Sequence, residues 1–313
     1  MRIIIESHIP FIRGIAENAG HSVEYLNPED FTPENIKNAD ALIIRTRTKC
    51  NAALLESSNV KIIATATIGT DHIDIDYCRK RGIAVHNAPG CNAPAVAQYV
   101  LSVVGHLKAE CRCLGIVGAG HVGSIVNRWA SANGMKTLLC DPPRALKEGT
   151  AGFVNLEEIA RRCDVITFHV PLDASTRHMI NKDFLAAVNP DAIIINTARG
   201  PIADTDALLS ASQTLAIDCW EGEPEINIEL LDKAAIATPH IAGYSLEGKQ
   251  RAAAMALNAV DATINLPVAD FMSSPSMDKI IASYNPIADT DALKSAPSAF
   301  ENLRNNYVYR AEP

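Results

Sequence analysis

The sequence predicts an α/β protein built on doubly wound parallel sheets. Short apolar runs alternate with helix-like stretches over most of the 313 residues, which is typical of parallel strands joined by crossover helices. Hydrophobic residues make up 48% of the chain and charged residues 20%, a balance that excludes a largely disordered protein. The length exceeds what one core usually holds, so we expect two or three domains.

The first set of apolar runs predicts a sheet in the N-terminal part of the chain. Helices are expected between the runs, most clearly at 10–18, 51–56 and 73–81. A longer apolar helix, at about 94–108, separates this set from the next. The expected strands are 3–5, 23–26, 41–44, 62–64 and 84–86.

A second set of runs predicts another sheet, with the number of strands found in a doubly wound dinucleotide-binding domain. A helix at 245–265 follows it. The tail at 268–313 differs in composition, with several prolines, and is expected to form a small appended module. The sequence Ile-Ala-Asp-Thr-Asp-Ala-Leu occurs at 202–208 and again at 287–293, and each copy is expected to begin a helix with an Asp or Thr cap. The expected strands are 114–117, 137–140, 165–169, 192–196, 215–218 and 236–237.

Charge and cysteine usage limit the partners and the compartment. The formal net charge is −8 and no block of Lys and Arg stands out, so neither nucleic acid nor a membrane surface is expected as a partner. No apolar run approaches the roughly 20 residues of a membrane span, and the N-terminus has no leader signature. Eight cysteines without a CxxC pair favour a reducing compartment over a disulfide framework or a metal site. We therefore expect a cytoplasmic protein without a metal.

The clearest motif is Gly118-Ala119-Gly120-His121-Val122-Gly123. It follows one expected strand and opens an expected helix, the setting in which GxGxxG binds a dinucleotide. Gly118 permits the tight turn, Gly120 lets the pyrophosphate approach the backbone, and Gly123 allows helix and strand to pack closely, while the helix N-terminus offers N–H groups to the phosphates.

An acidic residue at the end of the next expected strand indicates which dinucleotide is bound. Asp141 lies 23 positions after Gly118, where a carboxylate accepts hydrogen bonds from the ribose hydroxyls and repels a 2′-phosphate. The expected cofactor is therefore NAD. Arg144 follows closely, and a cation at this point would soften the preference.

Three polar motifs follow later strands, at the edge where open α/β sheets bind ligands. They supply Arg199, Glu223 and His240, which together suit the oxidation of a 2-hydroxy acid by a nicotinamide cofactor. A histidine accepts the hydroxyl proton because imidazole titrates near neutral pH, and a carboxylate beside it orients the ring. An arginine grips the substrate carboxylate and polarises the C2 oxygen. Taken singly each residue has an ordinary structural alternative, so the interpretation depends on their occurring together.

These motifs resemble those of the D-isomer-specific 2-hydroxyacid dehydrogenases. The likeness extends over about residues 1–265, and its matching pieces are the GxGxxG loop, Ala-Arg-Gly at 198–200, Glu-Pro at 223–224 and Pro-His at 239–240. The resemblance implies that Arg199, Glu223 and His240 are the catalytic residues. Asp218 is expected to contact the nicotinamide amide rather than the reacting carbon. Cofactor contacts are expected from Gly118, Gly120, His121, Val122, Gly123, Asp141, Pro171, Thr197, Asp218 and Gly243.

The resemblance further implies the domain organisation. A flavodoxin-like substrate domain, split between 1–92 and 241–267, is expected beside an NAD-binding Rossmann domain at 93–240. One branch of the family adds a C-terminal dimerisation domain, which would account for 268–313 and make the protein a homodimer. The connections near 109–113, 173–176 and 212–214 are shorter than is usual in the family.

A basic loop points to the substrate class. Residues 45–49, Arg-Thr-Arg-Thr-Lys, follow an expected strand, and three cations with two hydroxyls suit a phosphate, although a solvated basic loop has the same composition. After the next strand, Gly69 and Thr70 offer backbone N–H groups to a carboxylate. Asp71 and His72 beside them are expected to be turn and helix-cap residues.

Several segments resemble, in particular, the branch that oxidises a phosphorylated four-carbon 2-hydroxy acid in vitamin B6 synthesis. This closer resemblance implies phosphate contacts from Arg45, Arg47 and Tyr244. It also implies a 2-oxo acid as electron acceptor, with NAD staying bound through turnover. The matching segments are 45–49, 66–72, 90–93, 242–245 and 300–307.

Two alternatives stay open. Another 2-hydroxy acid, such as 3-phosphoglycerate or glycerate, fits the same catalytic trio. The fold also serves as an NAD-sensing binding module in transcriptional corepressors. The presence of Arg199, Glu223 and His240 argues against that role, because a sensor needs no proton relay.

Overall fold

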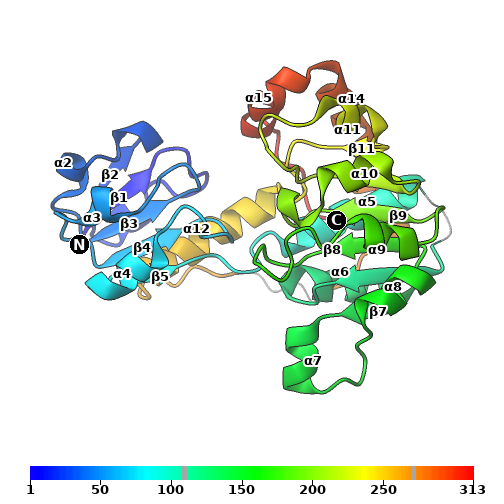
Figure 1. The fold of residues 1–313 in the computed structure, drawn as a ribbon. Coiled ribbons are helices and arrows are strands. Elements are labelled where there is room, and N and C mark those ends of the chain that lie inside the picture. Colours follow the sequence, from blue (N-terminus) through cyan, green and yellow to red (C-terminus); the bar gives the residue numbers. More distant parts are fainter. Residues whose placement is uncertain (108–110, 269–272) are drawn as a thin grey trace. The chain divides into compact units, whose positions relative to one another are not determined.

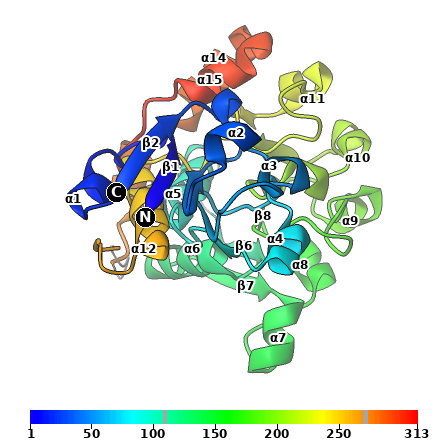
Figure 2. The same cartoon turned by 90° about the vertical axis from the view of Figure 1, so that its left-hand side faces the viewer.

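The computed structural model describes residues 1–107, 111–268 and 273–313. The chain forms two compact units: the first unit is Met1–Asn92 with Leu246–Asp270, and the second is Ala93–Ser245 with Phe271–Pro313. Each unit is a parallel sheet covered by helices (Figure 1), and the turned view in Figure 2 shows the same elements from another side. The expected doubly wound α/β class is confirmed. No helix in the described residues is long and apolar enough to cross a membrane.

The first unit contains a five-stranded sheet in the order β2-β1-β3-β4-β5. This is the flavodoxin-like order, in which the winding direction reverses between β1 and β3. All four residues of β3 are buried, which explains its unbroken apolar sequence, since central parallel strands are covered on both faces. The strands are β1 (Arg2–Glu6), β2 (Ser22–Leu26), β3 (Ala41–Ile44), β4 (Ile62–Thr65) and β5 (Ala84–His86).

Helices cover both faces of this sheet. Leu42 of β3 packs in one core with Leu55, whereas Ile43 packs in the opposite core with Leu257, as the two-residue period of a strand requires. The helices of this unit are α1 (Ile15–Asn18), η1 (Pro28–Asp30), α2 (Pro33–Ile36), α3 (Ala52–Leu55), α4 (Ile75–Arg81) and α12 (Leu246–Val260).

The second unit contains a six-stranded parallel sheet in the order β11-β10-β9-β8-β6-β7. Here the winding direction reverses between β6 and β8, which is the point where such sheets bind ligands. Each strand of the two sheets lies on one of the runs expected from the sequence. The strands are β6 (Cys113–Val117), β7 (Lys136–Cys140), β8 (Val165–Phe168), β9 (Ile193–Asn196), β10 (Thr214–Ile217) and β11 (Ile236–Ala237).

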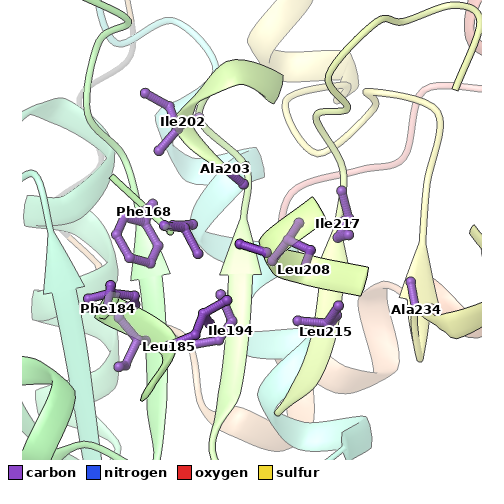
Figure 3. Packing of buried hydrophobic residues seen from close by; sticks show 14 of the residues in the cluster. Phe168, Phe184, Leu185, Ile194, Ile202, Ala203, Leu208, Leu215, Ile217 and Ala234 are labelled. Carbon is purple, nitrogen blue, oxygen red and sulfur yellow. The ribbon is translucent and has the colours of Figure 1, made fainter. Parts of the chain in front are cut away.

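Large apolar side chains fill the space between this sheet and the helices on one face (Figure 3). The rings of Phe168 and Phe184 meet edge to face, with centroids 5.7 Å apart. The other face is covered by α5 and α6, and Tyr99 of α5 and Trp129 of α6 are among its buried residues. The helices before the tail are α5 (Ala93–Leu107), α6 (His121–Ala132), α7 (Pro142–Glu148), α8 (Leu156–Arg162), α9 (Lys182–Ala187), η2 (Gly200–Ile202), α10 (Thr205–Ser210) and α11 (Ile228–Lys233).

The C-terminal tail packs on the second unit. The Thr290 hydroxyl accepts a hydrogen bond from the Ala237 amide of edge strand β11 at 3.0 Å, so the tail covers an edge that would otherwise be exposed. The Ser102 hydroxyl of α5 donates to the Ile280 carbonyl at 3.2 Å. The expected dimerisation role of 268–313 stays a prediction, and residues 269–272 of that segment lie outside the described residues. The tail helices are α13 (Met277–Ser283), α14 (Pro286–Ser295), η3 (Pro297–Ala299) and α15 (Phe300–Asn305).

Two expected helices are shorter in the structure by several residues. The helix expected at 10–18 begins only at Ile15, because Phe11 and Gly14 have positive φ angles of 61° and 80°. The helix expected at 245–265 ends at Val260, and the side chain of Asn258 then bonds both backbone groups of Leu266, at 2.9 and 2.8 Å. Lys108, the expected end of the long apolar helix, and residues 109 and 110 of a connection expected to be short, lie outside the described residues.

Candidate active site

The loop after β11 carries a histidine that is paired with a glutamate. His240 has a positive φ of 57°, and its amide donates to the Asp218 carbonyl at 2.9 Å. Its Nδ1 atom lies 2.6 Å from Oε1 of Glu223. Oε2 of Glu223 accepts from the Trp220 amide at 3.2 Å. The structure thus brings together two of the three residues expected to be catalytic.

The environment keeps Glu223 ionised. Burial alone would raise the pKa of this carboxyl, but the hydrogen bond and charge of His240, and the charge of Arg304, together lower it. An ionised Glu223 accepts the proton on Nδ1 of His240, which leaves Nε2 of the ring as the basic atom.

Asp218 is buried beneath the loop that carries His240. Its Oδ1 accepts from the Thr238 hydroxyl at 2.7 Å and the Ile241 amide at 2.8 Å, and its Oδ2 accepts from the Ala242 amide at 3.0 Å. Burial raises the pKa of Asp218 in spite of these donors. In the structure, therefore, this carboxyl holds the histidine loop, and its expected contact with the nicotinamide amide stays a prediction.

Arg199 follows β9 in a loop of fixed shape. The Asn196 side chain donates to the Arg199 carbonyl at 3.0 Å and accepts from the Ala198 amide at 3.1 Å. A Cβ on Gly200 would lie 2.0 Å from the Trp220 carbonyl oxygen, so only glycine fits there. The loop therefore fixes the backbone of Arg199 at the carboxyl edge of the sheet.

The glycine-rich loop joins β6 to α6 as expected. Gly118 has a φ of 89°, and a Cβ there would lie 2.8 Å from the His169 carbonyl. A Cβ on Gly123 would lie 2.0 Å from the Gly118 oxygen, whereas one on Gly120 would have nothing within 4 Å. Turn and packing thus require glycine at the first and third positions, and the second leaves open space where a pyrophosphate is expected.

The helix N-terminus and Asp141 lie beside this loop. α6 begins at His121, so the amides of His121 and Val122 are not used by the helix itself. Oδ2 of Asp141 accepts from the Ala119 amide at 2.8 Å, and its Oδ1 accepts from the Arg144 amide at 3.0 Å. This leaves further lone pairs on each oxygen for ribose hydroxyls. The residues present therefore fit a dinucleotide.

The side chain of Arg144 is held by an acidic partner. Its Nε and Nη2 donate to the two carboxylate oxygens of Glu148, at 2.9 and 2.7 Å, and its Nη1 donates to the Ala119 carbonyl. The cation that would soften the preference for NAD is therefore engaged elsewhere.

His169 directly follows β8 at the reversal of strand order, although the motifs do not single it out. Its Nε2 is 3.0 Å from the Thr167 hydroxyl, and its Nδ1 is 3.3 Å from the hydroxyl of Thr197, an expected cofactor residue. Burial lowers the pKa of His169 to about 3, so the ring is neutral at physiological pH. Pro171, another expected cofactor residue, is exposed two positions on. The available signal was the position of His169 directly after a strand at the reversal of strand order.

Arg45 and Arg47 lie where the strand order of the first unit reverses. The buried Glu6 ends β1, and its Oε2 accepts from the Arg45 amide at 2.8 Å and the Thr48 hydroxyl at 3.0 Å. Nη1 of Arg45 donates to the His8 carbonyl at 3.0 Å, and Arg47 is exposed. A buried carboxylate thus shapes the basic loop.

Gly69 and Thr70 lie in the loop after β4. Side chains of this loop stabilise it through hydrogen bonds with one another and with its backbone. The Thr67 hydroxyl donates to the Gly69 carbonyl at 3.1 Å. The Thr65 hydroxyl is 2.6 Å from that of Thr67 and 3.2 Å from Nε2 of His72. Burial lowers the pKa of His72. His72 is therefore a turn residue in the structure, as expected. The expected helix-cap role is wrong, because Asp74 caps α4 by accepting from the Tyr77 amide at 2.9 Å.

Comparison with known proteins identifies the family. Residues 102–242 match the family model for the NAD-binding domain of D-isomer-specific 2-hydroxyacid dehydrogenases. An erythronate-4-phosphate dehydrogenase of Bacteroides thetaiotaomicron is 44% identical, over 100% of this chain and 97% of its own length. The chain belongs to the D-isomer-specific 2-hydroxyacid dehydrogenase family. The expected family and the expected cofactor, NAD, are confirmed.

Other members of the family agree. An erythronate-4-phosphate dehydrogenase of Escherichia coli is 35% identical, over 100% of this chain and 92% of its own. Among solved structures, a 3-phosphoglycerate dehydrogenase of Entamoeba histolytica with bound NAD+ is 29% identical, with a TM-score of 0.70 over 87% of this chain and 99% of that chain. A D-lactate dehydrogenase of Aquifex aeolicus, complexed with NAD and lactic acid, is 27% identical, with a TM-score of 0.66 over 85% and 96%.

In this dehydrogenase Tyr244 lies among residues of the C-terminal tail. Its ring centroid is 6.1 Å from that of Tyr307 and 6.2 Å from that of Tyr309. Its amide donates to the carbonyl three residues earlier at 2.9 Å, which closes the turn that contains Gly243. The segment 300–307 matches one branch of the family, but no motif signals that Tyr307 and Tyr309 lie beside Tyr244, because only the folded chain brings them together.

The eight cysteines of this dehydrogenase are buried thiols. The Sγ atoms of Cys113 and Cys163 are 3.5 Å apart, and burial raises the pKa of the Cys163 thiol. Across the described ranges, no three or more His, Cys, Asp or Glu side chains are grouped so that they could hold a metal ion.

Proposed function

We propose that this dehydrogenase oxidises 4-phospho-D-erythronate to 2-oxo-3-hydroxy-4-phosphobutanoate in the synthesis of pyridoxal 5′-phosphate (vitamin B6). The observation that carries the proposal is the His240–Glu223 pair, with Nδ1 and Oε1 2.6 Å apart, in the same unit as an NAD-binding loop. Relatives named erythronate-4-phosphate dehydrogenase support the choice of substrate. NAD, when bound, accepts the hydride from C2 of the substrate.

His240 is the acid and base of this proposal. Nε2 removes the proton of the C2 hydroxyl as the hydride leaves, because Nδ1 already donates to Glu223. The negative charge of Glu223 stabilises the imidazolium that results, and its hydrogen bond keeps the ring in the tautomer that can act as a base.

The remaining groups bind and orient the substrate. Arg199 holds the C1 carboxylate and polarises the C2 oxygen, a task that suits a planar guanidinium. Gly69 and Thr70 donate backbone N–H groups to the same carboxylate. Arg45 and Arg47 bind the phosphate, and Tyr244 donates to it through its hydroxyl. These assignments rest on the family motifs and on the local geometry of each loop.

The proposal includes three further points. A 2-oxo acid reoxidises NADH while the cofactor stays bound, the protein is a homodimer through 268–313, and it works in the cytoplasm. The dimer can be tested separately, because light scattering of the purified chain would give about 67 kDa for two copies of the 33.6 kDa chain. A mass near that of one copy would contradict it.

The deciding experiment is a comparison of substrates. The purified protein is supplied with 4-phosphoerythronate, 3-phosphoglycerate or glycerate, and NADH formation is followed with and without 2-oxoglutarate. We expect turnover with 4-phosphoerythronate, stimulated by the 2-oxo acid. A higher kcat/KM for 3-phosphoglycerate would replace the proposed substrate. NADH binding without turnover of any of the three would favour the NAD-sensing alternative.

A further inference from the structure

Two oppositely charged side chains hold the two residues that directly follow His240. Asp218 accepts from the amides of Ile241 and Ala242, at 2.8 and 3.0 Å. The guanidinium of Arg310, from the C-terminal tail, donates to the carbonyls of the same two residues: Nη1 to Ile241 at 3.1 Å, and Nη2 to Ala242. The peptide that joins Ile241 to Ala242 therefore has an anion at its N–H group and a cation at its carbonyl group.

This loop needs support from outside, because the backbone of His240 is strained. Its φ is 57°, in the left-handed region that a residue with a Cβ adopts only when its surroundings fix it. The amide of His240 donates to the Asp218 carbonyl at 2.9 Å, which fixes the N-terminal side of the residue. The bonds to residues 241 and 242 fix its C-terminal side. Arg310 therefore helps to hold the conformation that sets the direction of the imidazole.

Arg310 uses its whole guanidinium in this region. The group has five N–H donors, and Arg310 makes five hydrogen bonds, all to uncharged oxygens. Besides the two loop carbonyls, the acceptors are the Gln98 side chain at 2.9 Å, the Ala95 carbonyl at 3.1 Å and the Tyr307 hydroxyl at 3.4 Å. The guanidinium carbon also lies 4.3 Å from the ring centroid of Tyr284. A lysine, with three donors on one nitrogen, cannot reproduce this set of bonds.

Helix α5 anchors both of the charged side chains. Arg310 donates to Gln98 of this helix. The Thr238 hydroxyl donates to Oδ1 of Asp218 at 2.7 Å, so its oxygen accepts from the hydroxyl of Tyr99 of α5, 2.7 Å away. Tyr99, Thr238 and Asp218 are all buried, so water does not compete for these bonds. The anion and the cation are thus fixed relative to each other by one helix.

We propose that Arg310 is a positioning residue for the histidine of the active site: it holds residues 241–242 by their carbonyls, opposite Asp218, and so places His240 for proton transfer. The inference rests on the proposed function, because it takes His240 to be the base. It applies to any 2-hydroxy acid that this enzyme oxidises, since Arg310 acts through the loop and is assigned no contact with substrate or cofactor. The C-terminal tail is thereby part of the framework of the site.

The test is a single-turnover measurement on Arg310→Met, a variant that keeps an unbranched side chain and removes the donors. Enzyme in excess over 4-phosphoerythronate is mixed with saturating NAD, and NADH formation is followed by stopped-flow absorbance. The limiting rate constant at high enzyme concentration reports the chemical step and does not depend on the fraction of enzyme that is folded. We expect it to fall about ten- to a hundredfold, because a small displacement of a catalytic group has an effect of this size.

Three further variants separate positioning from support of the fold. Arg310→Lys keeps the charge without the five donors and should recover little of the rate. In a His240→Asn background, Arg310→Met should lower the residual rate constant by a much smaller factor, because the group that Arg310 positions is gone. Lys294→Met is the matched control, since Lys294 is another cation of the tail that donates to two backbone carbonyls, those of Asp232 and Ala234, at 3.1 and 2.7 Å. Its loss should change Tm at most and leave the limiting rate constant at the wild-type value.

Three results would overturn the proposal. The first is a wild-type limiting rate constant in Arg310→Met, or failure of both Arg310 variants to fold, either of which would make Arg310 a structural residue only. The second is full recovery in Arg310→Lys, which would show that the charge suffices without the paired bonds. The third is an equal loss from Arg310→Met in the wild-type and His240→Asn backgrounds.

Failure of the proposed function gives a different pattern. If His240→Asn alone keeps the wild-type rate constant, His240 is not the base, whatever the Arg310 variants do. If the wild type prefers another 2-hydroxy acid, the proposed substrate is wrong, and the same single-turnover comparison made with that acid still tests the role of Arg310.

Discussion

The two sheets share their winding and differ in what they place at the reversal of strand order. β2-β1-β3-β4-β5 and β7-β6-β8-β9-β10 follow the same pattern, so each unit has one reversal point at which a ligand can bind. In the first unit this point carries Glu6 with Arg45 and Arg47. In the second unit it carries the glycine-rich loop. Topology therefore fixes where a ligand can bind, and the local residues decide which ligand is bound.

The two reversal points differ because different helices follow β1 in the first unit and β6 in the second unit. α1 (Ile15–Asn18) has four residues, too few to present a useful dipole, so an anion at the reversal point of the first unit must be bound by side chains. α6 (His121–Ala132) has 12 residues and is entered through Gly118 and Gly120, so an anion at the reversal point of the second unit is expected to be bound by backbone N–H groups. Side-chain cations can be replaced one at a time, whereas a loop that binds an anion through backbone N–H groups depends on its glycines.

The largest expected effect comes from a substitution that removes the general base and leaves both reversal points intact. His240→Asn is the suitable change, because His240 has a φ of 57° and asparagine tolerates the left-handed region. Loss of the general base should lower kcat by about 10²- to 10⁴-fold, while NADH binding followed by fluorescence stays at the wild-type level. A kcat within a few-fold of the wild type would exclude His240 as the base.

The next largest effect concerns the glycine-rich loop of the second unit. Gly118→Ala places a Cβ 2.8 Å from the His169 carbonyl at a φ of 89°, a strain of about 1–3 kcal/mol. We expect a lower Tm and NADH binding weakened about tenfold or more. Gly120→Ala is the control, because nothing lies within 4 Å of that Cβ: it should weaken NADH binding and leave Tm unchanged. Equal Tm values for the two variants would contradict this account of the loop.

The strands and strand-end motifs could be predicted because their signals are local. Central parallel strands such as β3 are buried on both faces, so their sequence is apolar throughout. The residues that follow them lie at the ligand-binding edge for topological reasons. This is why Arg45, Arg199 and His240 could be predicted as site residues from their positions and residue types taken together.

Helix starts were less predictable, as the repeated heptapeptide shows. In the first copy Asp204 caps α10 and accepts from the amides of Asp206 and Ala207, at 2.9 and 3.3 Å, as expected. The expectation for the second copy is wrong, because α14 (Pro286–Ser295) already begins before it, with Asn285 as the cap. Proline precedes both copies, as Pro201 and Pro286, and the difference lies one residue earlier. Asn285 caps α14 by accepting from the Ile287 amide at 3.0 Å, whereas Gly200 has no side chain with which to cap a helix. The same seven residues thus begin one helix and lie inside another.

The tail's share of the site could not be predicted from the sequence. Tyr307 and Arg310 belong to a segment that is expected to be an appended module, and their contacts with Tyr244 and with the loop after His240 are tertiary. No spacing rule relates residues so far apart in the chain. Such contacts follow only from how α14 and α15 pack on the second unit.

A moderate effect tests the side-chain cations of the first unit. Arg45→Gln and Arg47→Gln should each raise KM for 4-phosphoerythronate about tenfold, because each loses a charge-assisted contact with the phosphate. NADH binding should not change in either variant. Arg79→Gln removes an equal charge from an exposed pair with Asp76 on α4 and is the control. If KM stays at the wild-type value in both variants, the basic loop is only a solvated one.

The smallest expected effect tests how strictly the second unit selects NAD. Arg144 is held by two bonds to Glu148, at 2.9 and 2.7 Å, so Glu148→Gln should weaken this pair and free the cation for a 2′-phosphate. Asp141 still repels that phosphate, and exposed pairs are weak, so we expect the kcat/KM for NADP relative to NAD to rise only severalfold. Glu157→Gln weakens a similar pair on α8 and should leave the ratio unchanged. An unchanged ratio in Glu148→Gln would mean that Asp141 alone sets the preference, and the reversal point of the second unit would then select its ligand without help from Arg144.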